Sequence, residues 1–222
     1  MPTERDKPFL VVTWLTKLLV GENSCEWATW YKAHYQRRPE ESVPSTFDFT
    51  QWRIDHTALI NKVREEYEAQ GYTVTTERQN NFFLRGNVAT LSGTPDLIAI
   101  RGNEGIIIDA KTGKPSASHP VQVTIYMYAV PKGLQQHRNL KFSGHVVYSD
   151  LYKDQSTQIA PTAINDSFTE NLLGFIQRVA DTGKPARKVP SVMECGFCDI
   201  AQAQCEERAA GDERAVADTD DF

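Results

Sequence analysis

The pattern of apolar and polar positions is clearest around two short apolar runs, residues 97–100 (LIAI) and 106–108 (III). Runs of this length are too short for helices, and their β-branched side chains favour buried strands. Gly102, Asn103, Glu104 and Gly105 lie between the runs and favour a tight reversal of the chain. The sequence therefore predicts a β-hairpin of two buried strands.

The rest of the pattern predicts helices and strands around this hairpin. Apolar positions recur at helical spacing over residues 50–70 and 166–182, and a glycine follows each segment. Another helix is predicted to begin at Ser118 or His119, because Pro120 then falls in its first turn, where no hydrogen bond is lost. Strands are predicted at residues 73–78, 82–85, 141–148 and 155–160, and a short helix at residues 9–21.

The long helix predicted over residues 50–70 has one apolar face that includes a histidine. The apolar members of this face are Trp52, Leu59, Ile60, Val63 and Tyr67. His56 lies on the same face, one turn after Trp52. A single inward histidine is usually a packed core residue, and the residues alone favour that interpretation of His56 over metal ligation.

Three charged residues stand at the open end of the predicted hairpin. Asp96 begins the first strand, and Asp109 and Lys111 end the second. If the strands pair, the two carboxylates come close together, and they repel each other unless a cation neutralises them. Lys111 points to the same face as Asp109, since side chains alternate along a strand. Two carboxylates and a lysine around a divalent metal can activate water against a phosphodiester.

This set resembles the signature of the PD-(D/E)XK nuclease superfamily, with Pro95 and Asp96 followed by Asp109-Ala110-Lys111. The continuation through Thr112 and Gly113 to residues 122–126 (QVTIY) resembles the RecB-like branch, which includes the nuclease domains of RecB and AddB and the CRISPR-associated exonucleases. The resemblance covers about residues 50–149. It implies an α/β fold with an αβββαβ restriction-endonuclease-like core, a mixed central sheet, and N- and C-terminal helical segments joined by a cysteine site.

The resemblance also implies roles for individual residues. Asp96, Asp109 and Lys111 would be catalytic, and Gln122 and Tyr126, four apart on one helix face, would lie beside the active site and hold the DNA strand. In this branch a helix before the sheet supplies a histidine to the metal, which favours His56 as a ligand. The implied ligands of Mg²⁺ or Mn²⁺ are His56, Asp96, Asp109 and the backbone carbonyl of Ala110.

Three of the four cysteines, Cys195, Cys198 and Cys205, lie close together in sequence, whereas Cys25 lies near the start. In a reducing compartment such a group favours a metal or cluster site over disulfides, and the spacing leaves zinc and iron–sulfur both open. The three-plus-one arrangement resembles the cluster-binding RecB-like nucleases and implies a [4Fe–4S] cluster, with zinc as the less favoured occupant. Six residues separate Cys198 from Cys205, whereas that family commonly has five residues before its last cysteine.

Composition changes this picture little. The 222 residues, 40% hydrophobic and 24% charged, suit one sizeable globular domain, and the net charge of −5 is weak evidence against nucleic-acid binding. The sequence lacks a membrane-span or signal-peptide pattern, so we expect a cytoplasmic protein without membrane contacts. The predicted divisions are an N-terminal helical lobe with Cys25 (1–49), the nuclease core (50–183), a cysteine-cluster segment (184–208) and an acidic, disordered tail (209–222).

The function that the resemblance implies is a metal-dependent DNA exonuclease acting on single-stranded ends. Its setting would be CRISPR adaptation or phage or plasmid recombination and repair, with DNA and the proteins of those processes as partners. Two alternatives are a catalytically idle DNA-binding module and a zinc-stabilised interaction protein. The intact Asp96, Asp109 and Lys111 argue against the first, and the second leaves these residues unexplained.

Overall fold

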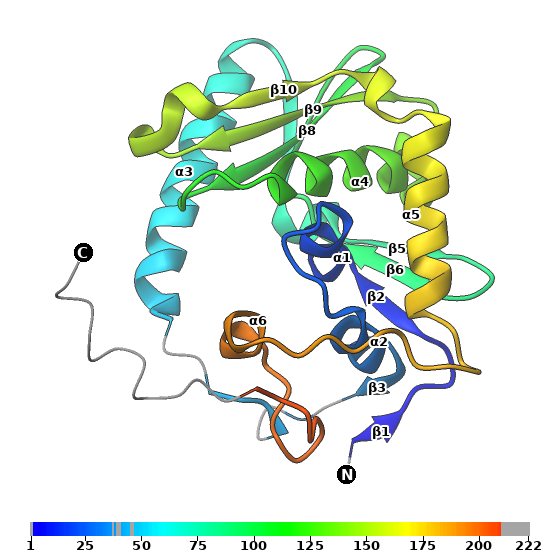
Figure 1. The fold of residues 1–222 in the computed structure, drawn as a ribbon. Coiled ribbons are helices and arrows are strands. Elements are labelled where there is room, and N and C mark those ends of the chain that lie inside the picture. The colour runs from blue at the N-terminus through cyan, green and yellow to red at the C-terminus, as the bar shows by residue number, and fades with distance from the viewer. Residues whose placement is uncertain (1, 37, 39–40, 45–46, 210–222) are drawn as a thin grey trace, which may run out of the picture.

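The computed structural model describes residues 2–36, 38, 41–44 and 47–209, and its centre is a five-stranded sheet in the order β10-β9-β8-β7-β4 (Figure 1). The strands are β4 (Thr73–Thr76), β7 (Leu97–Arg101), β8 (Glu104–Lys111), β9 (Lys141–Tyr148) and β10 (Thr157–Ile159). β8 and β9 run parallel, and the other neighbours are antiparallel. The predicted hairpin and the predicted α/β class with a mixed central sheet are therefore confirmed.

Helices cover both faces of this sheet. α3 (Phe49–Ala69) packs its buried Leu59, Ile60 and Val63 against one face, together with Leu97 and Ile108 of the hairpin. The alternate hairpin residues belong to the larger core on the opposite face, which includes α4 (Ser118–Gly133) and α5 (Asp166–Val179). This division follows from the strand period of two, because successive side chains point to opposite faces.

A second, three-stranded sheet joins the N-terminal region to the core. β2 (Phe9–Val11) pairs in parallel with β6 (Thr90–Gly93), which pairs antiparallel with β5 (Phe82–Arg85). The helix predicted over residues 9–21 was wrong in its first residues, because they pair with β6. The helix that follows, α1 (Val12–Leu19), begins directly after β2. Pairing across such a distance in sequence leaves no mark in the local hydrophobic pattern.

The remaining elements are short or lie near the chain ends. They are β1 (Thr3–Glu4), α2 (Glu26–His34), β3 (Tyr35–Gln36), η2 (Glu77–Asn80), η3 (Gln135–His137), η4 (Asp150–Gln155), η5 (Pro161–Ala163) and α6 (Val192–Phe197). The strand predicted over residues 73–78 therefore ends at Thr76, where η2 begins. Between the strands predicted over residues 141–148 and 155–160, the chain forms the helical segment η4.

One apolar position of the long helix was assigned to the wrong environment. Trp52 is 39% exposed, and residues 49–55 are all exposed. The reason is that the N-terminal half of α3 extends past the edge of the sheet, as Figure 1 shows, so the face that is buried at Leu59 has nothing to pack on at Trp52.

The predicted division into four segments stays a prediction. Of the acidic tail, residues 210–222 lie outside the described residues, as do residues 37, 39–40 and 45–46 near the end of the N-terminal segment. Within the part of the chain that is described, no helix combines the length and the apolar character needed to cross a membrane.

Candidate active site

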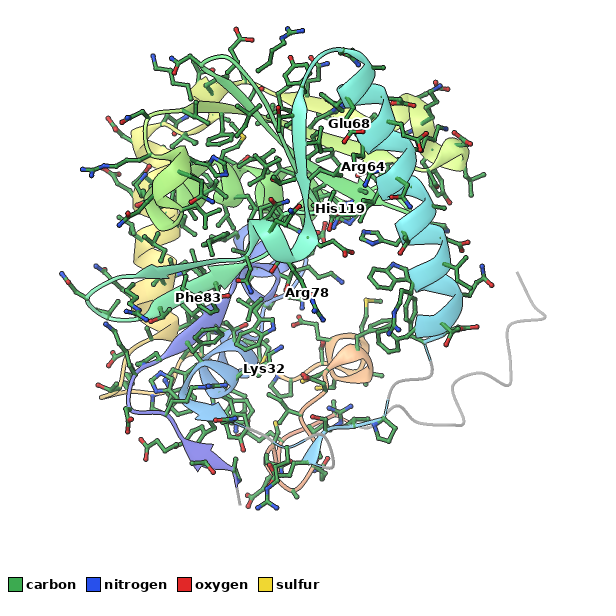
Figure 2. All side chains as sticks on the ribbon, turned by 180° about the vertical axis from the view of Figure 1, so that it is seen from behind. Lys32, Arg64, Glu68, Arg78, Phe83 and His119 are labelled. Carbon is green, nitrogen blue, oxygen red and sulfur yellow. The ribbon has the colours of Figure 1, made fainter. Side chains whose placement is uncertain are left out.

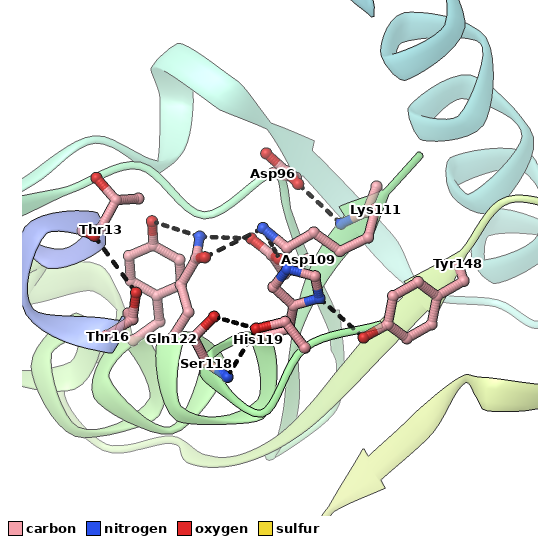
Figure 3. A network of polar contacts seen from close by, with 12 residues as sticks. Thr13, Thr16, Asp96, Asp109, Lys111, Ser118, His119, Gln122 and Tyr148 are labelled. Carbon is pink, nitrogen blue, oxygen red and sulfur yellow. Dashed lines mark hydrogen bonds and ion pairs between the residues drawn. The ribbon is translucent and has the colours of Figure 1, made fainter. Parts of the chain in front are cut away.

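Four elements bring the predicted site residues to one end of the central sheet, and Figure 3 labels Asp96, Asp109, Lys111 and Gln122 among them. Asp96 precedes β7 directly, and Leu97 is paired with Ile108 of β8, so Asp96 lies opposite the last residues of that strand. The residues that meet there are His56 from α3, Asp96, Asp109 and Lys111 from the hairpin, and Gln122 and Tyr126 from α4. The pairing of the two predicted strands therefore brings the two carboxylates to the same edge of the sheet.

Asp96 is held by contacts on its side chain and on its backbone. Its Oδ2 accepts a hydrogen bond from the backbone N–H of Ala110 at 2.8 Å and lies 3.3 Å from Nε2 of His56. Its backbone carbonyl accepts a hydrogen bond from the N–H of Glu77 at 2.9 Å. The structure thus places His56 beside Asp96, as the resemblance implied, and its role as a metal ligand stays a prediction.

Asp109 is the most buried charged group of the site, with 2% of its surface exposed. Its Oδ2 lies 2.7 Å from Nζ of Lys111, and its Oδ1 accepts a hydrogen bond from Nε2 of Gln122 at 2.8 Å. Lys111 also donates to Oε1 of Gln122 at 3.1 Å. Gln122 therefore holds both members of the ion pair, and the alternation that predicted a shared face for Asp109 and Lys111 is confirmed.

Gln122 and Tyr126 are both buried, with 8% and 3% of their surfaces exposed. Gln122 Nε2 donates to the Tyr126 hydroxyl at 3.3 Å as well as to Asp109. In this arrangement the two side chains support the Asp109–Lys111 pair from within the protein. The role in holding DNA that the resemblance implied for them stays a prediction.

Burial and neighbouring groups together raise the pKa of three side chains in the site. Burial raises the pKa of Asp109 to about 6, against the lowering effect of Lys111. Burial alone would lower the pKa of His56, but the hydrogen bond and the charge of Asp96 outweigh it and raise that pKa above its usual value. Burial and the charge of Asp109 raise the pKa of Tyr126, so its hydroxyl keeps its proton. The site therefore holds protons more tightly than isolated side chains would.

The donor atoms fit a divalent cation in their chemistry. Carboxylate oxygens and one imidazole suit Mg²⁺ or Mn²⁺, and Asp109 Oδ2, although paired with Lys111, accepts no hydrogen bond from the described residues. The N–H of Ala110 points to Asp96, so its carbonyl points to the same edge, past the end of β7. Across the described ranges, however, no three His, Cys, Asp or Glu side chains are arranged to hold a metal ion. Metal binding would therefore exchange the present contacts for metal bonds.

Asn80 is a positioning residue that sequence reasoning missed. It is fully buried, and its Nδ2 donates to the carbonyls of Pro95 at 3.1 Å and Thr75 at 3.0 Å, while its Oδ1 accepts from the Thr75 hydroxyl at 2.6 Å. It thereby fixes the backbone that carries Asp96. At the start of the same short helix, Glu77 has a φ of 40°, a strained value for a residue with a side chain. A polar asparagine in the run Arg-Gln-Asn-Asn gave no signal of burial.

Sequence reasoning also missed a pair of residues, one of which lies at the start of α4. His119 Nδ1 and the Tyr148 hydroxyl form a hydrogen bond of 2.8 Å, drawn in Figure 3. Burial and the charge of Lys111 lower the pKa of His119 to about 4, so this imidazole is neutral near pH 7. The sequence indicated His119 only as a helix-start residue. Its pairing with a residue at the end of β9 depends on the parallel β8–β9 arrangement.

The four cysteines come together although they lie far apart in sequence. Cys25 precedes α2, Cys195 lies in α6, and Cys198 and Cys205 follow α6, and all four are free thiols. They line one cavity of about 420 Å³. Burial raises the pKa of Cys205 against the lowering effect of Lys188, and the three neighbouring thiols add to the rise. The segments that carry the cysteines therefore lie around one cavity, but within the described residues no three of the thiols are arranged to hold a metal ion, and the cluster stays a prediction.

Protein contacts hold this meeting point together. The Glu194 carboxylate accepts hydrogen bonds from the backbone N–H groups of Ser24 at 2.9 Å and Cys25 at 3.1 Å. Trp27 and Tyr31 stack at 5.0 Å in the same cluster of buried residues as Cys205. Four thiols around one cavity fit the chemistry of zinc or of an iron–sulfur cluster, and the choice between them stays a prediction.

Comparison with known proteins gives a family match and a fold match. The sequence profile of the PD-(D/E)XK nuclease superfamily matches residues 11–206. None of the curated proteins matches the sequence. Among solved structures, the chain is similar to the crystal structure of SSO0001, with a TM-score of 0.51 and 16% identity, covering 94% of this chain and 90% of that one. At this identity the likeness concerns the fold alone.

The raised pKa of Asp109 predicts a pH-dependent stability in the absence of metal. The pKa is 3.8 in an unperturbed chain and about 6 in the fold, so the folded protein binds the additional proton and loses stability as pH rises through this range. Asp109→Asn stays neutral, so its free energy of unfolding relative to wild type should rise by up to roughly 3 kcal/mol across the same range. Urea unfolding in EDTA at a series of pH values measures this difference.

The control is Asp154→Asn, which removes an exposed carboxylate on η4. Its difference from wild type should stay nearly constant with pH. A difference for Asp109→Asn that is equally constant would contradict the burial cost assigned to Asp109.

Proposed function

Because the chain belongs to the PD-(D/E)XK nuclease superfamily, whose members are typically metal-dependent nucleases, we propose that it is a RecB-like DNA exonuclease acting on single-stranded ends. The observation that carries the proposal is the convergence of Asp96, Asp109 and Lys111 at one sheet edge, with His56 in contact with Asp96. We place this activity in CRISPR adaptation or in phage or plasmid recombination and repair, with DNA and the proteins of those processes as partners.

Four groups would hold the metal. They are the side chains of His56, Asp96 and Asp109 and the backbone carbonyl of Ala110. The oxygen donors suit Mg²⁺ or Mn²⁺, and the imidazole shifts the preference toward Mn²⁺. A bound ion would supply an acidified water molecule and neutralise charge that develops on the scissile phosphate.

The other residues would orient the reacting groups. Lys111, with its ammonium 2.7 Å from Asp109, would direct the attacking water and stabilise the negative charge of the transition state. Attack in line on phosphorus then breaks the bond to the neighbouring sugar oxygen. Gln122 fixes Asp109 and Lys111 relative to each other through two hydrogen bonds. With Tyr126 it would also help to hold the strand.

For the cysteines we propose a [4Fe–4S] cluster bound by Cys25, Cys195, Cys198 and Cys205, with zinc as the second candidate. The cluster would link the N-terminal region to the last part of the fold, where the Glu194 carboxylate already ties α6 to Cys25. Because binding at such a site contributes to folding free energy, its role would be structural. The phosphodiester chemistry lies with the separate group at the sheet edge.

Substitution of the carboxylates tests the activity. Asp96→Ala and Asp109→Ala should each lower cleavage of end-labelled single-stranded DNA by about a hundredfold or more in Mn²⁺, because each removes a metal ligand. Lys111→Ala should slow cleavage but keep Mn²⁺ affinity, because the ammonium acts on water and on the transition state. Asp154→Ala, an exposed position, is the matched control and should cleave like wild type.

The same assay with circular single-stranded DNA, and with Mg²⁺ or EDTA, separates the parts of the proposal. A linear strand should be degraded, a circle should persist, and EDTA should stop the reaction. Degradation of circles at the same rate would contradict action at ends. Wild-type rates in the two carboxylate variants would contradict the whole assignment.

Iron content tests the cysteine proposal. Protein purified without oxygen should be brown and contain about four irons and four sulfides per chain. Cys25→Ser should lose the colour, because all four thiols line one cavity, whereas Ser24→Ala next to it should keep it. The cysteine variant should also expose the N-terminal region to protease, since a link between the chain ends is removed.

A colourless protein with one equivalent of zinc would overturn the cluster in favour of the second candidate. Full iron content in Cys25→Ser would instead show that the fourth ligand is another residue.

A further inference from the structure

The N-terminal end of α3 exposes a group of aromatic rings. Phe47 and Phe49 are each 54% exposed, and Trp52 is 39% exposed. We call these three residues the aromatic patch. Leaving large apolar rings in water forgoes the free energy that burial would release, and contiguous exposed patches commonly mark binding sites. Since the patch lies at and just before the half of α3 that extends past the sheet, packing within the described chain does not account for it.

The aromatic patch is continuous with the candidate active site. The Phe47 ring lies 5.0 Å from that of Phe49 and 6.4 Å from that of Trp52. Trp52 stacks on His56 at 4.7 Å with an interplanar angle of 17°. His56 Nε2 in turn lies 3.3 Å from Oδ2 of Asp96. A row of rings therefore runs from solvent to the carboxylate where cleavage is proposed.

Two arginines lie close in sequence to parts of this row. Arg53 follows Trp52 on α3. Arg78 lies on η2 directly after Glu77, whose backbone N–H donates a hydrogen bond to the Asp96 carbonyl. Both arginines are exposed, and neither forms a salt bridge within the described residues. Flat rings flanked by free cations suit a polymer of flat bases on a phosphate backbone, and they suit an aliphatic protein surface less well.

We propose that the aromatic patch is a stacking platform for the unpaired bases of single-stranded DNA, and that it leads the strand past His56 to Asp96. This inference rests on the proposed nuclease function and adds to it the feature that selects unpaired DNA. A duplex keeps its bases stacked on each other inside the helix, so it has no base faces to offer to Phe49 or Trp52. This helix end then contributes to the selection of single strands.

The test compares two strands of equal length in EDTA, where no cleavage occurs. One carries bases, and the other is abasic, with the same phosphate backbone and nothing to stack. Phe49→Ala and Trp52→Leu should each weaken binding of the base-bearing strand roughly fivefold or more, the change that corresponds to about 1 kcal/mol of stacking. Binding of the abasic strand should change less than about twofold, because its phosphate contacts remain.

Two further variants serve as controls. Phe83→Ala removes a ring of matched exposure, 52%, from β5, on the opposite side of the molecule from α3 in Figure 2, and should bind both strands like wild type. Trp52→Phe keeps a ring against His56 and should restore most of the affinity that Trp52→Leu loses. Thermal melting of each variant confirms that the fold is kept.

Three results would overturn the platform. The first is an equal loss of affinity for the base-bearing and the abasic strand, and the second is unchanged binding of both strands in Phe49→Ala and Trp52→Leu. The third is a dimer in sedimentation that dissociates on these substitutions, because the patch would then bind a second copy of the chain. Cleavage by wild type with no base-dependent loss in the variants leaves the nuclease function standing without the platform. Base-dependent binding without cleavage in any metal would instead support the platform and contradict the nuclease function.

Discussion

The burial of one carboxylate sets the arrangement around it. Asp109 is 2% exposed, and a charge taken out of water has to be balanced by an opposite charge and by hydrogen bonds. Lys111 supplies the charge and Gln122 the hydrogen bond, and Gln122 in turn contacts Tyr126. The position of α4 against the sheet is thereby tied to a group whose pKa is raised, and a cation in place of the Lys111 contact would satisfy the same carboxylate.

Much of this centre could be predicted because its geometry is local. The period of two along β8 puts Asp109 and Lys111 on one face, and a tight turn at Gly102, whose φ is 61°, sets the register that brings Asp96 beside them. His56 was found only through the resemblance, because a histidine on an apolar helix face is usually core. The structure explains the difficulty, since His56 lies where α3 passes from packed to exposed.

The features that escaped prediction all depend on contacts between distant parts of the chain. Asn80 is buried because the Pro95 carbonyl needs a donor, and nothing in the sequence near Asn80 encodes that need. β2 was assigned to a helix because its partner, β6, lies far along the chain. Trp52 fits the apolar period of α3 but has no sheet beneath it. Hydrophobic periodicity gives the face of a helix, and it does not give the length of the surface on which that face rests.

The central claim is that the sheet edge binds a divalent cation through His56 and two carboxylates. Pulsed electron paramagnetic resonance of the protein with Mn²⁺ tests it directly, because a nitrogen bonded to manganese gives a distinct coupling. The account predicts one tightly bound manganese per chain with this coupling, its loss in His56→Gln, and loss of the bound ion when Asp96 and Asp109 are both changed to asparagine. Manganese that binds equally well to that double variant, or that shows no nitrogen coupling in the wild-type protein, would contradict it.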